Sequence, residues 1–258
     1  STPTKAVAIT NAPTSCAAVM TTAERFVFAL GASGNPRMVK WCDQEDNTAW
    51  TPSTTNQAGD FELQTVGSLK TGKRVRGINL LFTDVDVHVS TYIGLPYVYS
   101  FEKAGSGCGV ISSQAVGAID TAAIWMSRSG FWIYDGYVKP LVSDVGDYVF
   151  QNMNYNQCSK VYCVHNSKYG EITWFYPSAQ SNENDSYVTY NYREGHWSIG
   201  SMARTAGTDR GVFLDPLMVS SDGYIYEHEV GFNSDGSTPY AETGRSEEHT
   251  PELQSHSF

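Results

Sequence analysis

The chain has 258 residues, which is enough for one large hydrophobic core or two small ones. Aromatic residues make up 13% and charged residues only 17%, so the composition excludes a disordered chain and favours strands and turns over exposed helices. The net charge of −10 argues against a protein that binds nucleic acid mainly through phosphate contacts. Cys158 and Cys163 are the only close pair among five cysteines, so we expect buried thiols instead of a zinc site or a disulfide scaffold.

Alternation of apolar and polar residues, with turn residues between, recurs along the chain. Residues 24–30 and 37–41 are predicted strands, and the polar stretch 42–59 is a predicted loop. Five aromatic-rich hairpins are then expected, and they cover residues 74–94, 122–136, 160–176, 186–200 and 217–231. Residues 144–153 are predicted to form a helix or an extended crossover. No segment reaches the roughly 18 apolar residues of a membrane-spanning helix, and residues 1–23 lack the apolar core of a signal peptide.

The hairpins predict an all-β fold, and we interpret it as an incomplete or irregular β-propeller. Two hairpins end in an aromatic residue and a glycine, at Gly94 and Gly136, which are 42 residues apart. Four-stranded propeller blades of roughly 40–50 residues suit that interval. A β-sandwich or jelly roll is the alternative, because alternation and turns do not separate these architectures. Trp125, Trp132 and Trp174 lie on hairpin arms among apolar neighbours, so we expect them to be buried.

Every candidate for catalysis has a structural interpretation that we favour. The glycine-rich residues 105–109 lack the following helix of a phosphate loop, because Val110 onward is a predicted strand. Asp84 and Asp86 are interpreted as acids of a hairpin turn, and His228 as part of a solvated strand. A basic cluster is interpreted as a solvated strand edge or turn; it consists of Lys70, Lys73, Arg74 and Arg76. We therefore expect no catalytic, cofactor-binding or metal-binding residues, and no enzyme activity.

The loop 42–59 is the candidate interface. Loops beyond roughly 12–15 residues without secondary structure are usually functional or disordered. Trp50 beside Pro52 would give this loop an aromatic anchor of the kind that interfaces favour. The candidate interface residues are Asp43, Asp46, Trp50 and Pro52.

Several segments resemble virion proteins of tailed bacteriophages. They are residues 40–52, 56–60, 91–96, 107–109, 170–177 and 197–200. Their order and spacing are similar to the propeller-forming tail hub or nozzle proteins of short-tailed phages, a group that includes packaged-DNA stabilisation proteins. The resemblance spans roughly residues 24–244.

This resemblance implies a structural virion protein without catalytic residues or cofactors. Such a protein would dock other tail proteins, associate with itself into a ring, and form part of a conduit that double-stranded DNA passes without specific binding. Its place would be the virion, with no membrane contact. The alternative is a carbohydrate-binding or carbohydrate-cleaving β-propeller, and cleavage would require two carboxylates in one pocket.

The chain is expected to have three parts. Residues 1–23 form an N-terminal extended segment, and residues 24–244 form a truncated propeller-like domain. Residues 245–258 begin Arg-Ser-Glu-Glu-His-Thr-Pro-Glu-Leu-Gln-Ser and resemble a translated sequencing adapter. The natural sequence is therefore expected to depart from this one near Gly244.

Overall fold

The computed structural model of the protein describes residues 7–231, and nearly all of its regular structure is strand. The chain divides into two compact units, Ser1–His228 and Glu229–Phe258, and every described strand belongs to the first. Its helical elements are α1 (Gly146–Gln151) and the 3-10 turns η1 (Ala32–Gly34) and η2 (Tyr155–Lys160). No helix of the described residues is long and apolar enough to cross a membrane. The segment 245–258 lies outside the described residues, so its interpretation stays a prediction.

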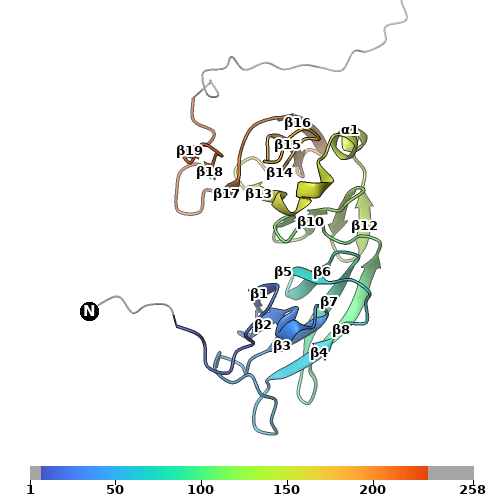
Figure 1. Ribbon diagram of the computed structural model, residues 1–258. Coiled ribbons are helices and arrows are strands. Elements are labelled where there is room, and N and C mark those ends of the chain that lie inside the picture. The colour runs from blue at the N-terminus through green and yellow to red at the C-terminus, as the bar shows by residue number, and fades with distance from the viewer. Residues whose placement is uncertain (1–6, 232–258) are drawn as a thin grey trace, which may run out of the picture. The chain divides into compact units, whose positions relative to one another are not determined.

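Five antiparallel sheets follow one another along the chain (Figure 1). The first contains β1 (Ala18–Thr21), β2 (Val27–Leu30), β3 (Met38–Trp41) and β4 (Gly59–Glu62). The second contains β5 (Leu69–Val75), β6 (Ile78–Thr83), β7 (Asp86–Gly94) and β8 (Val98–Ser106). The third contains β9 (Val116–Ala118), β10 (Ala123–Met126), β11 (Phe131–Tyr134) and β12 (Val138–Leu141). The fourth contains β13 (Tyr162–Asn166), β14 (Glu171–Tyr176), β15 (Ser186–Asn191) and β16 (His196–Ser201), and the fifth contains β17 (Ala206–Thr208), β18 (Leu217–Val219) and β19 (Ile225–Glu227).

The sheets are joined through their first strands, as the blades of a propeller are. Strand β1 contacts β5, β5 contacts β9, β9 contacts β13, and β13 contacts β17. Within every sheet the strands pair in chain order, without the crossovers between sheets that a Greek-key sandwich requires. The fold is therefore all-β and an irregular β-propeller, as predicted, with a fifth sheet of three strands. Strand β1 lies within residues 1–23, so the propeller part begins earlier than residue 24.

Glycines in the first strands let neighbouring sheets approach closely. A Cβ at Gly117 would lie 2.9 Å from the Ile172 side chain of the fourth sheet. A Cβ at Gly207 would lie 2.7 Å from the Val164 side chain, also in the fourth sheet. A Cβ at Gly72 would overlap the Met20 side chain of the first sheet. A glycine on each of these strands leaves the room that the adjacent sheet fills.

The largest core cluster joins the second, third and fourth sheets. Trp125 and Trp174 are fully buried in it, as predicted, whereas Trp132, which was also predicted to be buried, is only half-buried against it. The indole N–H of Trp125 donates to the Cys108 carbonyl (2.6 Å), and that of Trp174 donates to the Ala115 carbonyl (2.9 Å). Both rings are thus buried without leaving a polar atom unpaired.

The five predicted hairpins are confirmed as β6–β7, β10–β11, β13–β14, β15–β16 and β18–β19, and the predicted helix is α1. The prediction that a strand starts at Val110 was wrong. Val110 lies in the connection from β8 to β9, where its N–H donates to the Thr83 carbonyl (2.9 Å). The pairing of β8 with β7 skips Ala104, which forms a β-bulge two residues before the strand ends at Ser106.

Candidate functional site

Trp50, the expected anchor of an interface, is part of the core. Its side chain is only 6% exposed and packs with Ala29 and Cys42 over the face of the first sheet that points away from the second sheet. Its indole N–H donates to the Asn47 carbonyl (2.6 Å). A ring that is already buried and hydrogen-bonded is not available to a partner, so this finding removes Trp50 from the candidate interface.

Asp43 and Asp46 use their carboxylates to hold the loop 42–58 in shape. Asp43 Oδ1 accepts hydrogen bonds from the backbone N–H groups of Gln44 (2.9 Å) and Gln57 (2.8 Å), which ties the two ends of the loop together. Asp46 Oδ1 accepts from the hydroxyl (2.6 Å) and the N–H (2.9 Å) of Thr48. These two bonds hold the pKa of Asp46 below its usual range. Both acids therefore act as turn-forming residues.

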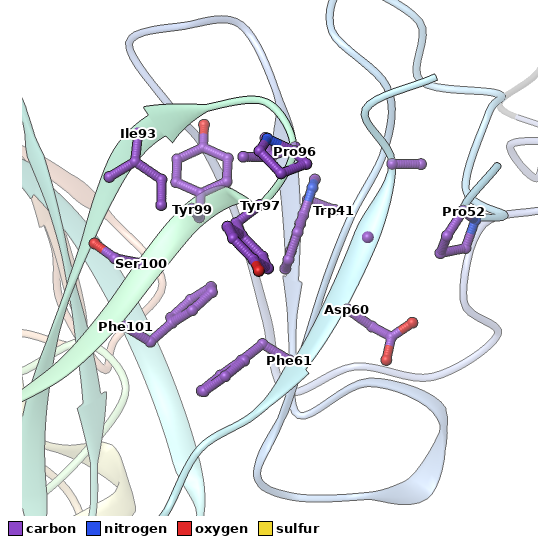
Figure 2. A pocket seen from close by; sticks show the side chains of 13 residues that line it. Trp41, Pro52, Asp60, Phe61, Ile93, Pro96, Tyr97, Tyr99, Ser100 and Phe101 are labelled. Carbon is purple, nitrogen blue, oxygen red and sulfur yellow. The ribbon is translucent and has the colours of Figure 1, made fainter. Parts of the chain in front are cut away.

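Pro52, the fourth candidate, borders a groove of about 570 Å³ between the first and second sheets (Figure 2). The groove lies between β4 on one side and the turn from β7 to β8 on the other. Its lining consists of Trp41, Pro52, Ala58, Gly59, Asp60, Phe61, Ile93, Pro96, Tyr97, Val98, Tyr99, Ser100 and Phe101. We call this surface the aromatic groove.

Stacked rings form the wall of the aromatic groove. Phe61 and Phe101 lie 4.5 Å apart and nearly parallel, at 6°, and Trp41 lies 5.8 Å from Phe101. Trp41 lies against Gly59, where any Cβ would overlap its ring, and its N–H donates to the Gln57 carbonyl (2.8 Å). The rings are thus held in place before any ligand arrives, which lowers the entropic cost of binding.

The turn from β7 to β8 brings exposed apolar side chains to the rim. Tyr97 is 76% exposed, Leu95 70% and Ile93 53%. Val98, which follows Tyr97, has a φ of 65°, a left-handed conformation that β-branched residues rarely adopt. Backbone strain of this kind gathers at functional sites, where the surrounding structure holds it. Tyr97 is therefore exposed at the rim, whereas Tyr99, two residues further on, is buried.

The groove offers π faces and no paired acids. Asp60 is the one carboxylate in its lining. Phe61 and Gly59 face the groove, so alternation along β4 turns the Asp60 side chain to the opposite face of the strand (Figure 2). In the described part of the chain no group of three or more His, Cys, Asp or Glu residues is placed to hold a metal ion. The arrangement suits the binding of flat or apolar surfaces.

Asp86 is a buried structural acid. Its oxygens accept hydrogen bonds from Thr65 Oγ1 (2.8 and 2.9 Å), Thr83 Oγ1 (2.6 Å) and Lys103 Nζ (2.8 Å). Burial alone would raise the pKa of Asp86, but the bonds from Lys103, Thr83 and Thr65 outweigh it and lower the pKa. His88 lies 3.2 Å away, and burial lowers its pKa, which favours a neutral ring. Asp84, two residues before Asp86, forms an ion pair with Lys70 (3.4 Å between Oδ2 and Nζ).

The remaining candidates also have structural roles. Three residues of the basic cluster lie on β5, an edge strand, and Arg76 lies in the turn after it, as predicted. His228 Nε2 accepts a hydrogen bond from Arg204 Nε (2.9 Å), and this guanidinium lies 4.5 Å from the centre of the Tyr226 ring. The described cysteines are all free, and three of the five are buried.

No protein-family model matches the chain, and no curated protein matches it. Among solved structures it is similar to the AfRom2 CNH domain, with a TM-score of 0.47 and 12% identity over 88% of this chain and 75% of that one. The N-terminal domain of Nup159 gives a TM-score of 0.46 and 9% identity over 81% of this chain and 59% of that one. Hsv2p from Kluyveromyces lactis gives a TM-score of 0.45 and 11% identity over 81% of this chain and 60% of that one. The chain spans about three fifths of the length of the Nup159 domain and of Hsv2p. Structural likenesses this distant assign no function.

Proposed function

We propose that this protein is a non-enzymatic structural component of a phage tail, a hub or nozzle protein that docks a neighbouring tail protein in the aromatic groove. One observation carries the proposal. Three segments that resemble tail hub proteins, residues 40–52, 56–60 and 91–96, come together around this groove. The segments of the resemblance and the aromatic groove thus coincide.

The chemistry of the groove supports docking. Aromatic residues are enriched at protein interfaces, and a few buried rings carry most of the binding energy. Tyr97 stands out from a turn whose backbone is strained at Val98, beside the fixed stack of Phe61 and Phe101. In this proposal Tyr97 is the anchor that the sequence led us to expect at Trp50.

Assembly into a ring and location in the virion belong to the same proposal. The negative net charge of the chain does not extend to β5, the first strand of the second sheet, because β5 carries Lys73 and Arg74. Such residues would attract phosphates.

A second candidate function, carbohydrate binding, is favoured by the exposed ring of Tyr97 and the partly exposed ring of Phe61. Aromatic faces of this kind can stack on the apolar faces of sugars. Cleavage is disfavoured, because it requires two carboxylates and the groove has one, turned to the other face of β4.

The experiment compares the full chain with Tyr97→Ala and with Tyr137→Ala, a matched control whose ring is 63% exposed outside the groove lining. Binding is measured by interferometry against the tail proteins encoded by the neighbouring genes. We expect Tyr97→Ala to weaken binding by at least roughly 10-fold, as loss of a hot-spot residue does, and Tyr137→Ala to leave it unchanged. A glycan array is run in parallel with the same variants. Glycan binding lost with Tyr97→Ala would support the second function, and turnover of any polysaccharide would refute the structural role.

A further inference from the structure

Strand β4 is the outer edge of the first sheet, and it pairs with β3 alone among the described strands. At its end the Leu63 N–H donates to the Arg37 carbonyl (3.0 Å), in continuation of the register between β3 and β4. Antiparallel strands alternate between residue pairs that exchange hydrogen bonds and pairs that do not. Counted back from Leu63, every second residue bonds to β3, so Asp60 and Glu62 direct their backbone N–H and C=O groups outward. We call this side of β4 the free edge.

The opposite side of β3 follows the same alternation. The Met38 carbonyl accepts from the Gly31 N–H (2.8 Å), and the Cys42 N–H donates to the Val27 carbonyl (3.2 Å). Even-numbered residues of β3 therefore bond to β2, and odd-numbered ones bond to β4. Within residues 7–231 no hydrogen bond reaches the backbone N–H or C=O of Asp60. The free edge is thus a template for one more strand.

The aromatic groove runs along β4, beside the free edge (Figure 2). Its lining includes β4 from Gly59 to Phe61 and β8 from Val98 to Phe101. A strand added to β4 would lie about 4.8 Å from it, with side chains that point alternately to the two faces of the sheet. A side chain opposite Phe61 would share the face of Phe61 and enter the groove. The next side chain along would share the opposite face with Asp60.

The polar groups on the rings of the groove already have partners, with the exception of the Tyr97 hydroxyl. The Trp41 N–H donates to the Gln57 carbonyl, and the Tyr99 hydroxyl donates to Glu24 Oε2 (3.1 Å). These rings therefore offer apolar faces to a ligand and few hydrogen bonds. Side chains that enter the groove should be apolar, and the orienting hydrogen bonds must come from the free edge.

The charges beside the free edge select the partner. Asp60 is exposed and forms no ion pair with a residue of the described part of the chain, whereas Glu62 binds Arg37 (2.5 Å). Opposite charges on directly paired strand residues are stabilising, and like charges are destabilising. Two β4 edges from two copies would bring carboxylates together, and residues 232–258 carry five acidic residues against one arginine. A basic side chain from another protein suits the position opposite Asp60.

We propose that a tail protein docks by adding an extended segment to the free edge, as a further strand of the first sheet. The inference rests on the proposed function, docking in the aromatic groove, and names the chemistry of the docked segment. Apolar side chains of this segment enter the groove beside Phe61, and a Lys or Arg between them lies opposite Asp60. In strand addition, main-chain hydrogen bonds give affinity and pockets for alternate side chains give specificity.

The first test measures amide hydrogen exchange of the full chain by NMR. The probe is a short synthetic peptide that alternates lysine and valine, and its control alternates glutamate and valine. In the free chain we expect the amides of Asp60 and Glu62 to exchange faster than that of Phe61, which bonds to β3. Saturating lysine–valine peptide should slow both amides at least roughly 10-fold, and the glutamate–valine peptide should not. Amides that are already slow in the free chain would show that the chain itself occupies the edge, and would overturn the proposal. So would amides that the lysine–valine peptide leaves unchanged.

The second test compares two substitutions at one position. Asp60→Pro removes the outward N–H and no bond to β3, and proline is accepted on edge strands. Asp60→Asn is the matched control, because it removes the charge and keeps the N–H. We expect Asp60→Pro to weaken binding of the lysine–valine peptide at least roughly 10-fold at any salt concentration. Asp60→Asn should weaken it at low salt only, because salt screens exposed charges. Folded Asp60→Pro that binds like the wild type would overturn strand addition, and the exchange measurement decides if Asp60→Pro does not fold.

The same variants separate this inference from the proposed function. Binding of a tail protein that is lost in Tyr97→Ala and kept in folded Asp60→Pro would leave docking in the groove intact and overturn strand addition. Binding that Tyr97→Ala leaves unchanged would overturn both.

Discussion

Replacing Asp86 with Ala is expected to destabilise the second sheet strongly, because this carboxylate holds together parts of the chain that are far apart in sequence. Thr65 precedes β5, Thr83 ends β6, and Lys103 lies on β8, and all three donate to Asp86. Removing one partner of a buried ion pair costs about 3–5 kcal/mol. Lys103 is 41% exposed and can turn toward water, so we expect a loss near the lower end, about 3 kcal/mol.

The pH dependence has a definite sign. The pKa of Asp86 is lower in the folded protein than its ordinary value of 3.8, so its stabilisation is present above that value and is lost as the pH falls through the folded pKa. The pKa of His88 is also lowered, from 6.5, so the unfolded chain binds this proton more readily and stability begins to fall below pH 6.5. The difference in unfolding free energy between wild type and Asp86→Ala should therefore persist from pH 7 down to about pH 4 and shrink below it.

Urea unfolding followed by tryptophan fluorescence measures these free energies at pH 7, 5 and 3. Thr65→Val is the companion variant, since it removes one donor and leaves the ion pair with Lys103 intact; we expect it to cost about 1–2 kcal/mol. A loss below about 1 kcal/mol for Asp86→Ala at pH 7, the size of an exposed ion pair, would refute the assignment of Asp86 as a buried clamp. A difference that stays constant from pH 7 to pH 3 would refute the ionised state assigned to it.

Three further predictions concern stability. Trp50→Ala should cost about 3–5 kcal/mol in the isolated protein, because it empties the cap over the first sheet; chemical denaturation measures the loss, and a change under about 1 kcal/mol would mean that the ring is not core. Gly117→Ala should destabilise by about 1–3 kcal/mol through overlap with Ile172, whereas Gly130→Ala, which meets no atom within 4 Å, should change the melting temperature little. Deleting residues 245–258 should leave the free energy of unfolding within about 0.5 kcal/mol of the starting value, and a loss of several degrees in melting temperature would contradict the adapter interpretation.

The middle strands of the sheets could be predicted from the sequence, and most of the outer and inner ones could not. Strand β10 is a continuous apolar run that is buried on both sides, and β14 ends in the buried aromatic run Trp174–Tyr176, which gives a strong signal. The first strand β5 contains Lys70, Gly72 and Lys73, and β17 is Ala-Gly-Thr. Their place is set by contacts with the neighbouring sheets, which strand propensity does not record.

The site shows the same division. The polar composition of residues 42–59 correctly predicted a loop, but its one tryptophan, expected at an interface, turns inward because one face of the first sheet offers apolar surface to bury. Exposure of Tyr97 depends on a turn in which Gly94 and Val98 both have positive φ. Gly94 alone was a usable signal for that turn. Nothing in the sequence around either residue indicates that Phe61 of the first sheet would stack on Phe101 of the second sheet, next to Tyr97.

Trp50 and Ala12, which pack over the first sheet, make the two ends of the described series of sheets different. Because each sheet packs mainly on the sheets before and after it, loss of a terminal sheet breaks one interface, whereas loss of an internal sheet breaks two. The first sheet has the extra contacts of Trp50 and Ala12 to lose, and the three-stranded fifth sheet has no such contacts from residues 7–231. Backbone amides in β18 should therefore exchange their hydrogens with solvent sooner than those in β2, with the intermediate sheets between them. Fraying would then travel along the chain from its last strands toward its first.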